Sequence, residues 1–138
     1  MSTTAGYSGT PLPKKLGVKD DHVVLLDRLP EGVDLGLPPG VTVVRRVRAG
    51  LDLTVTFHTR LASLEQRLPT LFEHTVTDGM VWVAWPKQAA VKRLGLVTDL
   101  DDNVVRAAGL YLGWVDVKVA AIDETWSGQK FVRRLKDR

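Results

Sequence analysis

The sequence predicts a single α/β domain with a mixed, mostly parallel sheet of five or six strands, a C-terminal antiparallel hairpin strand and two main helices on one face. Two amphipathic segments each separate one apolar strand from the next, which favours right-handed crossovers between parallel strands. The last two strand-like runs are joined by only a short turn, so the final strand is expected to run antiparallel. The 138 residues, 44% of them apolar, suffice for one domain with a real core.

The composition and charge of the chain argue against several classes of function, namely those that need cysteine, nucleic acid or a membrane. The chain has no cysteine, which excludes disulfides and thiolate chemistry and favours the cytoplasm. The formal charge is +3 and the basic residues are scattered, so we expect no nucleic-acid partner. No stretch is apolar for long enough to suggest a membrane span or an export signal, so we expect no membrane partner. Residues 1–10 are small and polar and predict a flexible lead-in to a domain over residues 11–135.

The first half of the domain reads as three strands. His22–Asp27 is a short run rich in valine and leucine, typical of a fully buried strand, and Val41–Val47 is a second strand with a basic end. Between them the sequence is rich in turn residues and leaves no room for a long helix. Leu51–Phe57 alternates strictly, with Asp52, Thr54 and Thr56 on the opposite side from the apolar residues. This alternation predicts a strand with one wet face.

The next segment is a helix followed by the most apolar strand. Leu61, Leu64, Leu68, Leu71 and Phe72 recur at helical spacing over residues 60–75, with Thr59 placed to cap the start and Pro69 to kink the helix. Gly79 is expected to end this segment in a conformation with positive φ. Met80–Trp85 is apolar on both faces, which places it in the middle of the sheet.

The last third predicts a helix and a hairpin. Thr98 and Asp101 are spaced like a capping box, and the apolar residues that follow, up to Leu112, form a helical stripe that Gly113 ends. Val115–Ile122 alternates as a strand. The turn 123–128 then leads into the final strand, residues 129–134.

This order of elements resembles the C-terminal half of the Rossmann-like class I methyltransferase fold. The resemblance implies a cofactor site behind the first strand, where glycines let the backbone approach the cofactor. Here that turn is Asp27–Gly32 with one glycine, and the second strand ends in Arg45, Arg46 and Val47 instead of an acidic residue that would bind ribose. These departures disfavour an active methyltransferase.

A second resemblance covers nearly the whole chain. It rests on YSGTPLPKKLG (Tyr7–Gly17), VWVAWPK (Val81–Lys87), TDL (Thr98–Leu100) and the stretch Val115–Arg134, in this order. Together these motifs resemble a family of small uncharacterised actinobacterial proteins classed as a domain of unknown function. The resemblance implies no activity, cofactor or substrate.

Five residues are candidates for a ligand site because they follow strands whose carboxyl ends share one edge of the sheet. They are Asp27, His58, Lys87, Asp123 and Trp126. Each also has a structural interpretation. Lys87 can pair with an edge carboxylate, His58 has no serine, cysteine or second histidine placed by spacing as its partner, and Trp126 can cover the sheet edge.

The remaining polar clusters predict no catalytic or metal site. His22, His58 and His74 lie in three different elements, and Asp99, Asp101 and Asp102 are explained by the start of a helix. We therefore expect no metal, no cofactor and no catalytic residue. The sequence favours a non-catalytic binding or regulatory module. The alternative is a small-molecule or anion-binding protein or a remote enzyme.

The expected partner is a second copy or another protein. Trp82 on the central strand needs cover, and residues 28–50 are too short to supply helices over the second face of the sheet. We predict that Tyr7–Leu16 folds back over part of that face and that any remaining apolar patch supports a homodimer or binds a partner.

Overall fold

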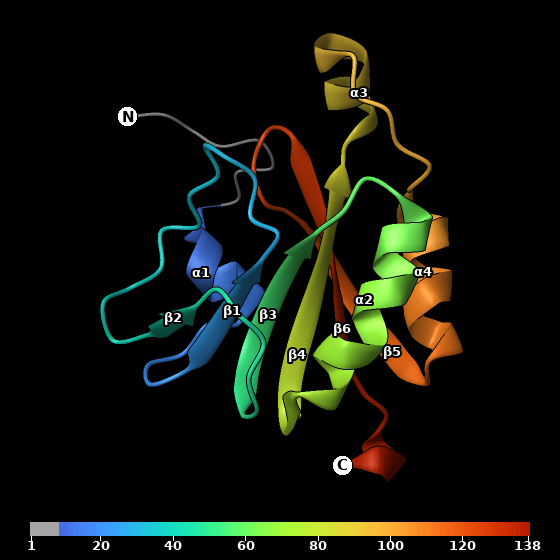
Figure 1. Cartoon of the computed structure of the whole chain (residues 1–138). Helices are drawn as coiled ribbons and strands as arrows, with labels where there is room; N and C mark the ends of the chain where they lie inside the picture. The colour runs from blue at the N-terminus through green and yellow to red at the C-terminus, as the bar shows by residue number, and fades with distance from the viewer. Residues whose placement is uncertain (1–8) are drawn as a thin grey trace.

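A computed structural model describes residues 9–138 and contains a six-stranded sheet with four α-helices (Figure 1). The predicted lead-in therefore lies mostly outside the described residues, and Tyr7 lies outside them entirely. The elements in chain order are α1 (Leu12–Leu16), β1 (Val23–Asp27), β2 (Thr42–Val44), β3 (Leu51–Phe57), α2 (Leu61–Glu73), β4 (Thr75–Pro86), α3 (Gln88–Leu94), α4 (Asp102–Tyr111), β5 (Trp114–Ala121), β6 (Trp126–Arg133) and the short 3₁₀ helix η1 (Leu135–Asp137).

The predicted mixed sheet is confirmed. Its strand order is β2-β1-β3-β4-β6-β5. The strands β2, β1, β3 and β4 pair in parallel, whereas β6 is antiparallel to both of its neighbours, β4 and β5. The final strand thus forms a hairpin with β5 and also fills the space between β5 and β4. It starts at Trp126, three residues earlier than expected, because Trp126 pairs with Pro86 and Ser127 with Trp85.

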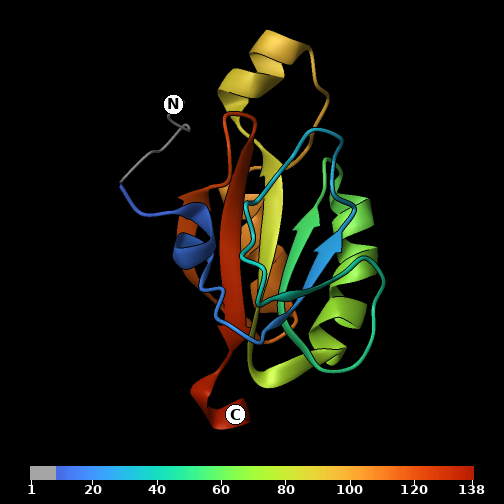
Figure 2. The same ribbon diagram turned by 90° about the vertical axis from the view of Figure 1, so that its left-hand side faces the viewer.

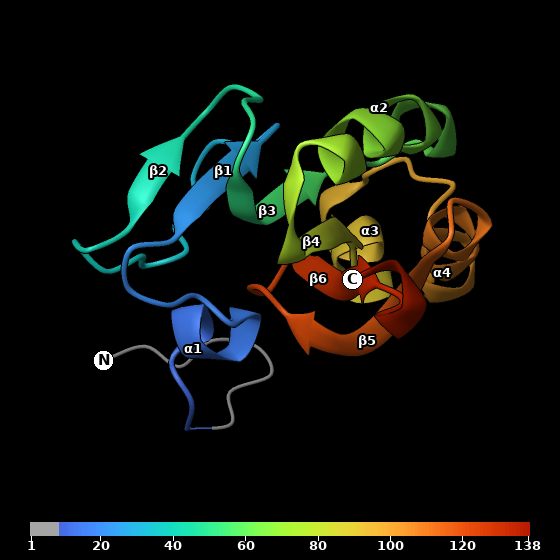
Figure 3. The ribbon, with the colours of Figure 1, turned by 90° about the horizontal axis from the view of Figure 1, so that it is seen from below.

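One face of the sheet carries the two main helices. Apolar residues of α2 and α4 pack on Val81, Val83 and Trp85 of β4 and on Phe131 of β6. Figure 3 shows α2 and α4 on one side of the sheet and α1 on the other. Phe72 of α2 stacks on Trp114 with ring centroids 3.9 Å apart. The predicted pair of helices on one face is therefore confirmed.

The second face is covered by α1 and by the irregular segment 29–41. Leu16 and Leu35 are buried against Val55 and Trp82. The indole Nε1–H of Trp82 donates to the carbonyl oxygen of Leu16 at 2.8 Å, and Trp82 is 0% exposed. The described part of the segment, up to Leu16, folds back over the sheet as predicted, but on β3 it covers the side of Leu53 and Val55 and not the predicted side of the threonines. Figure 2 shows α1 beside β6. Because Trp82 is covered in this way, it offers no apolar patch on this face for a partner.

The expectation of a wet face on β3 is wrong. Thr54 and Thr56 are completely buried and point to the side of α2, while Leu53, Val55 and Phe57 face the second core. Alternation marked the two faces correctly, but α2 covers the polar one. The hydroxyl of Thr56 is hydrogen-bonded there, whereas that of Thr54 has no partner among the described residues.

Two local predictions about helix starts are also corrected. Arg60, not Thr59, occupies the N-cap of α2, and the carboxylate of Asp99 accepts from the Leu61 N–H at 2.7 Å. The N-cap of α4 is Asp101, whose Oδ1 accepts from the Val104 N–H, while the Thr98 hydroxyl donates to the carbonyl of Thr59 instead.

Two glycines are required by close approach. Gly79 does not end α2, which stops at Glu73, but lies in an irregular part of β4 where a Cβ would be 2.6 Å from Thr75 Cγ2 and 2.9 Å from the Asp52 oxygen. Gly109 of α4 lies directly on Phe131, where a Cβ would be 2.2 Å from ring carbon Cε1. These contacts bring backbone and ring together at distances that only glycine permits.

Candidate functional site

Two of the predicted site residues meet at the carboxyl edge of the sheet. Asp27 is the last residue of β1 and His58 follows the last residue of β3, its neighbour. They are joined through Thr56, whose Oγ1 lies 2.7 Å from Asp27 Oδ2 and 2.7 Å from His58 Nε2. The other ring nitrogen of His58, Nδ1, lies 2.8 Å from Ser63 Oγ on the first turn of α2. Four polar side chains thus form one continuous chain.

The direction of these hydrogen bonds follows from the charge on Asp27. An ionised carboxylate only accepts, so the Thr56 hydroxyl donates to it. The oxygen of Thr56 is then free to accept from His58 Nε2–H. With its proton on Nε2, His58 has an accepting Nδ1, to which the Ser63 hydroxyl donates. The chain therefore runs from Ser63 to Asp27 with a neutral imidazole in its middle.

Arg67 of α2 neutralises Asp27. Its Nη2 donates to Oδ1 at 2.7 Å and its Nε to Oδ2 at 3.1 Å, which is the bidentate geometry that a guanidinium forms with a carboxylate. Burial acts to raise the pKa of Asp27, which is 3% exposed, but the hydrogen bonds from Arg67 and Thr56 and the charge of Arg67 outweigh it and lower the pKa below 3.8. Asp27 is therefore ionised at neutral pH.

His58 is held neutral. Burial, followed by the positive charge of Arg28, lowers its pKa to about 4, and the opposing effect of Asp27 is smaller. The ring is 2% exposed. A base of this pKa accepts a proton from a hydroxyl only weakly, because the imidazolium would be formed next to two guanidinium groups, those of Arg28 and Arg67.

A hollow of about 520 Å³ opens above these residues at the carboxyl edge. Its lining combines cations, hydroxyls and aromatic rings: Arg28, Pro30, Phe57, His58, Thr59, Arg60, Ser63 and Trp126. Trp126 packs edge-on against Phe57, with ring centroids 5.2 Å apart. A second, more polar hollow of about 640 Å³ adjoins along α2, lined by Arg28, Ser63, Gln66, Arg67 and Thr70. Arg28 and Ser63 line both hollows.

Arg28 has an unusual backbone and an unpaired charge. Its φ is 58°, in the left-handed region that residues other than glycine, asparagine and aspartate seldom adopt. Among residues 9–138, no carboxylate forms an ion pair with its guanidinium. Such a conformation costs about 1–3 kcal/mol and is concentrated at functional sites. It is found here where the chain leaves β1 for the segment that covers the second face.

Lys87 and Asp123 form a separate group. The Lys87 N–H donates to the Thr125 carbonyl at 2.8 Å, and Asp123 Oδ1 accepts from the N–H groups of Thr125 and Trp126. Burial lowers the pKa of Lys87, while the charges of Asp123 and Glu124 oppose this. These contacts give Asp123 a structural role in the β5–β6 turn. Neither Lys87 nor Asp123 lines the hollow that His58 and Trp126 share. A ligand role for any of the five residues stays a prediction.

Several residues of the site were not predicted. The expectation that His58 lacks a serine partner is wrong, because the turn into α2 places Ser63, five residues later, on its ring. This contact could have been predicted from the sequence, because Ser63 follows His58 by five residues and the predicted helix begins between them. Arg28, Thr56 and Arg67 were missed because their positions depend on the rotation of α2 and on a left-handed residue after β1.

Metal and membrane features are not found in the described part of the chain. Over residues 9–138, no three His, Cys, Asp or Glu side chains are grouped so that they could hold a metal ion. Within the same range, no helix is both long enough and apolar enough to cross a membrane.

Comparison with known proteins gives structural likeness only. No protein-family model matches the chain, and no curated protein matches it. The resemblance to the actinobacterial family therefore stays a prediction. In contrast, the fold is similar to many solved structures.

Several of the similar structures are methyltransferases, and another, LepI, was solved in complex with SAM. The N-methyltransferase NodS from Bradyrhizobium japonicum has a TM-score of 0.54 at 11% identity, covering 87% of this chain and 88% of that one. A protein from Sulfolobus solfataricus, named a putative type 11 methyltransferase, has a TM-score of 0.55 at 10% identity, and the match covers 89% of both chains. The magnesium protoporphyrin IX methyltransferase from Synechocystis with bound SAM has a TM-score of 0.56 at 7% identity, covering 83% of this chain and 71% of that one.

The fraction of each matched protein that this chain covers varies. The chain spans 39% of LepI, which was solved in complex with SAM, and 54% of a second structure of the Synechocystis enzyme. At these identities the likeness establishes the fold alone, and the chain has a fold like that of class I methyltransferases.

Proposed function

We propose that the chain is a non-catalytic binding module that holds a small anionic ligand, bearing a phosphate or a carboxylate, in the hollow at the carboxyl edge of its sheet. The observation that carries this proposal is the unpaired guanidinium of Arg28, which lines both hollows together with the hydroxyl of Ser63. An arginine without a carboxylate partner, in a concave site, is suited to planar recognition of an anion.

The surroundings of Arg28 support an anion in two further ways. Arg60 lines the same hollow and holds Asp99 only loosely, at 3.9 Å. The first turn of α2 begins here. Asp99 accepts from the Leu61 N–H, but the other N–H groups of this turn have no partner within the helix and favour negative charge. Trp126 and Phe57 line the hollow as well, so a ligand with a planar apolar part gains contact area there.

The electrostatics of His58 favour binding over catalysis. A serine, a histidine and an aspartate arranged in a chain would suit a nucleophile and its base. However, the pKa of His58 is lowered to about 4 by burial and by Arg28, so the ring is a poor acceptor for the serine proton. The donors of Ser63, His58 and Thr56 are used within this hydrogen-bond chain, so the guanidinium of Arg28 is left as a donor to an anion.

Methyl transfer is the weaker candidate. The similar structures include a methyltransferase with bound SAM, but here a strained arginine, Arg28, and Pro30 follow β1 where a glycine-rich turn would bring the backbone to a cofactor. β2 is only three residues long. SAM therefore belongs in the ligand test as the competing outcome.

A thermal-shift screen tests the proposal. Inorganic phosphate, nucleoside monophosphates, short carboxylic acids and SAM are each added to the full chain, and the ligands that raise the Tm are then measured by calorimetry. An anion is expected to bind, and Arg28→Gln is expected to weaken it by roughly 10- to 100-fold, the range for one charged hydrogen bond. Arg28→Lys should weaken it less, because the charge remains.

Arg48→Gln is the matched control, since Arg48 is an exposed arginine that precedes β3 at the opposite edge of the sheet. If no anion raises the Tm, or if Arg28→Gln binds as tightly as the wild type, the proposal is wrong. Binding of SAM alone would instead favour the cofactor site of the similar structures.

A further inference from the structure

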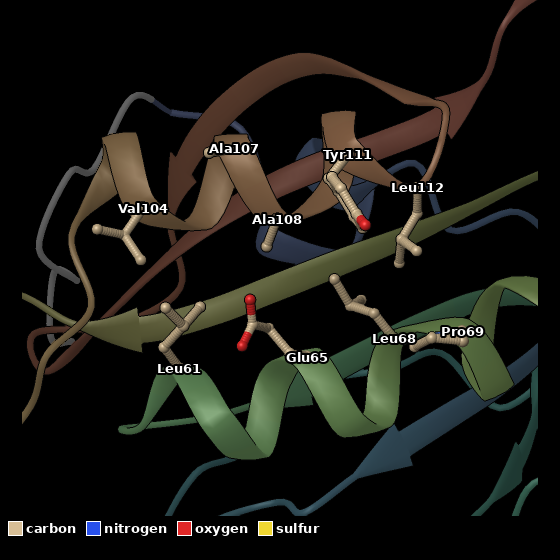
Figure 4. A pocket seen from close by; sticks show the side chains of 9 residues that line it. All are labelled: Leu61, Glu65, Leu68, Pro69, Val104, Ala107, Ala108, Tyr111 and Leu112. Atoms are coloured by element: carbon tan, nitrogen blue, oxygen red, sulfur yellow. The ribbon is translucent and has the colours of Figure 1, made fainter.

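An apolar groove of about 590 Å³ runs between α2 and α4, on the side of the molecule away from α1. Leu61, Leu68 and Pro69 line it from α2, and Val104, Ala108 and Leu112 from the α4 side (Figure 4). Tyr111 also lines it and is 89% exposed. Leu112 is exposed as well, and an exposed tyrosine and leucine beside an apolar groove are typical of a surface that binds another protein.

A single carboxylate lies in the middle of this groove. Among the described residues that line it, Glu65 is the only charged one, and Figure 4 shows its carboxylate pointing from α2 toward α4. No residue in the range 9–138 gives this carboxylate a hydrogen bond or an ion pair. An occupant of the groove is therefore expected to bring apolar side chains and a cation.

The helix α3 of the same chain has this chemistry. In Figures 1 and 2, α3 projects beyond the carboxyl edge of the sheet, away from the other helices. Val91 and Leu94 are three residues apart, so they share one side of the helix, and Leu94 is 54% exposed. Lys92 and Arg93 are exposed beside them, and the described residues form no ion pair with either.

We infer that the occupant is α3 of a second copy, so that two chains exchange their α3 helices across a two-fold axis. Leu94 enters the apolar groove, and Lys92 or Arg93 pairs with Glu65 of the other chain. Each copy offers one α3 and one groove, so the exchange is reciprocal and closes as a dimer. The inference does not rest on the anion site, which uses other residues.

Charge reversal with mixing gives a sharp test. In a homodimer of Glu65→Arg, the arginine in each groove faces Lys92 and Arg93 of the other chain, so cations repel. In a homodimer of the double variant K92E/R93E, the new carboxylates of α3 face Glu65 of the other chain, so anions repel. Both variants are expected to weaken self-association by about tenfold or more, because each reversal acts twice in a symmetric dimer. When the two are mixed, both contacts become attractive again, and a heterodimer is expected at wild-type affinity.

Analytical ultracentrifugation of the full chain over a range of concentrations measures these affinities. One protein carries a fluorescent label in the mixing experiment, so that the heterodimer is detected directly. Lys136→Glu, at an exposed lysine of η1, is the matched control for a change of net charge. Thermal melting of each variant checks that the fold is kept, as expected for exposed positions.

Tyr111→Ser gives a second variant that does not depend on charge, and it is also expected to weaken the dimer. A wild-type protein that stays monomeric at every concentration would overturn the inference. So would a dimer whose affinity neither reversal changes, or reversals that weaken the dimer without recovery on mixing.

Discussion

Arg67 on α2 donates two hydrogen bonds to Asp27 at the end of β1, from Nη2 to Oδ1 at 2.7 Å and from Nε to Oδ2 at 3.1 Å. Arg67→Met removes both bonds and leaves a buried carboxylate without a counter-charge. We expect a loss of about 3 kcal/mol in the free energy of unfolding, measured by urea denaturation at neutral pH. Arg67→Lys should lose part of this, because an ammonium cannot form the paired geometry. Arg106→Met, at an arginine of α4 without an ion pair in the described structure, should change little.

The pKa of His58 makes stability depend on pH. Its folded-state value of about 4 lies below the ordinary 6.5, so between these two values the unfolded chain binds more protons than the folded one. The contribution is complete above pH 6.5 and is lost as the pH falls toward 4, with a total of about 3 kcal/mol. In His58→Gln the slope of unfolding free energy against pH should flatten over this window. The steep loss below 3.8, to which Asp27 contributes, should remain.

Two threonines on the same face of β3 are expected to respond in opposite directions. The hydroxyl of Thr54 is buried without a partner among the described residues, so Thr54→Val removes an unsatisfied polar group and should stabilise the fold by about 1 kcal/mol. Thr56→Val deprives Asp27 and His58 of their shared partner and should cost about 2 kcal/mol. Chemical denaturation of both variants measures the difference. Equal effects would contradict the assigned hydrogen bonds.

Gly109→Ala tests the contact between α4 and Phe131. Alanine favours a helix over glycine by about 1 kcal/mol. The added Cβ, however, would lie 2.2 Å from Phe131 Cε1, and Phe131 is completely buried. The cost of overpacking, about 1–3 kcal/mol, should exceed the gain in helix propensity, so the Tm is expected to fall. Gly40→Ala, where the nearest atom is Asp20 Oδ1 at 3.5 Å, is the control and should melt close to the wild type.

The order of elements could be predicted from the sequence because periodicity and turn residues are local. The apolar run around Trp82 gave the central strand, and the short turn after Ile122 gave the reversal of the last one. The burial of Thr54 and Thr56 could not be predicted in the same way. Polar residues on one side of a strand suggest water, yet α2 packs over this side, where Thr56 bonds Asp27 and His58 and Thr54 is left without a partner among the described residues.

The proximity of three candidate residues could be predicted from the sequence, while their binding of a ligand stays a prediction. The rule that strand ends share an edge predicted that Asp27, His58 and Trp126 lie near one another, and in the structure Thr56 joins Asp27 to His58, and Trp126 lines the same hollow as His58. Their partners Ser63 and Arg67 lie on a helix, and which of its sides meets the sheet depends on packing across the whole core. Lys87 follows the same rule but is directed to the β5–β6 turn by its backbone bond to Thr125.

The position of β6 between β4 and β5 has a consequence for folding. β6 follows both of these strands in the chain, yet it pairs with each of them along its length. Until β6 is in place, β4 and β5 each expose an open strand edge. Loss of β6 is therefore expected to cause aggregation more than a local loss of structure.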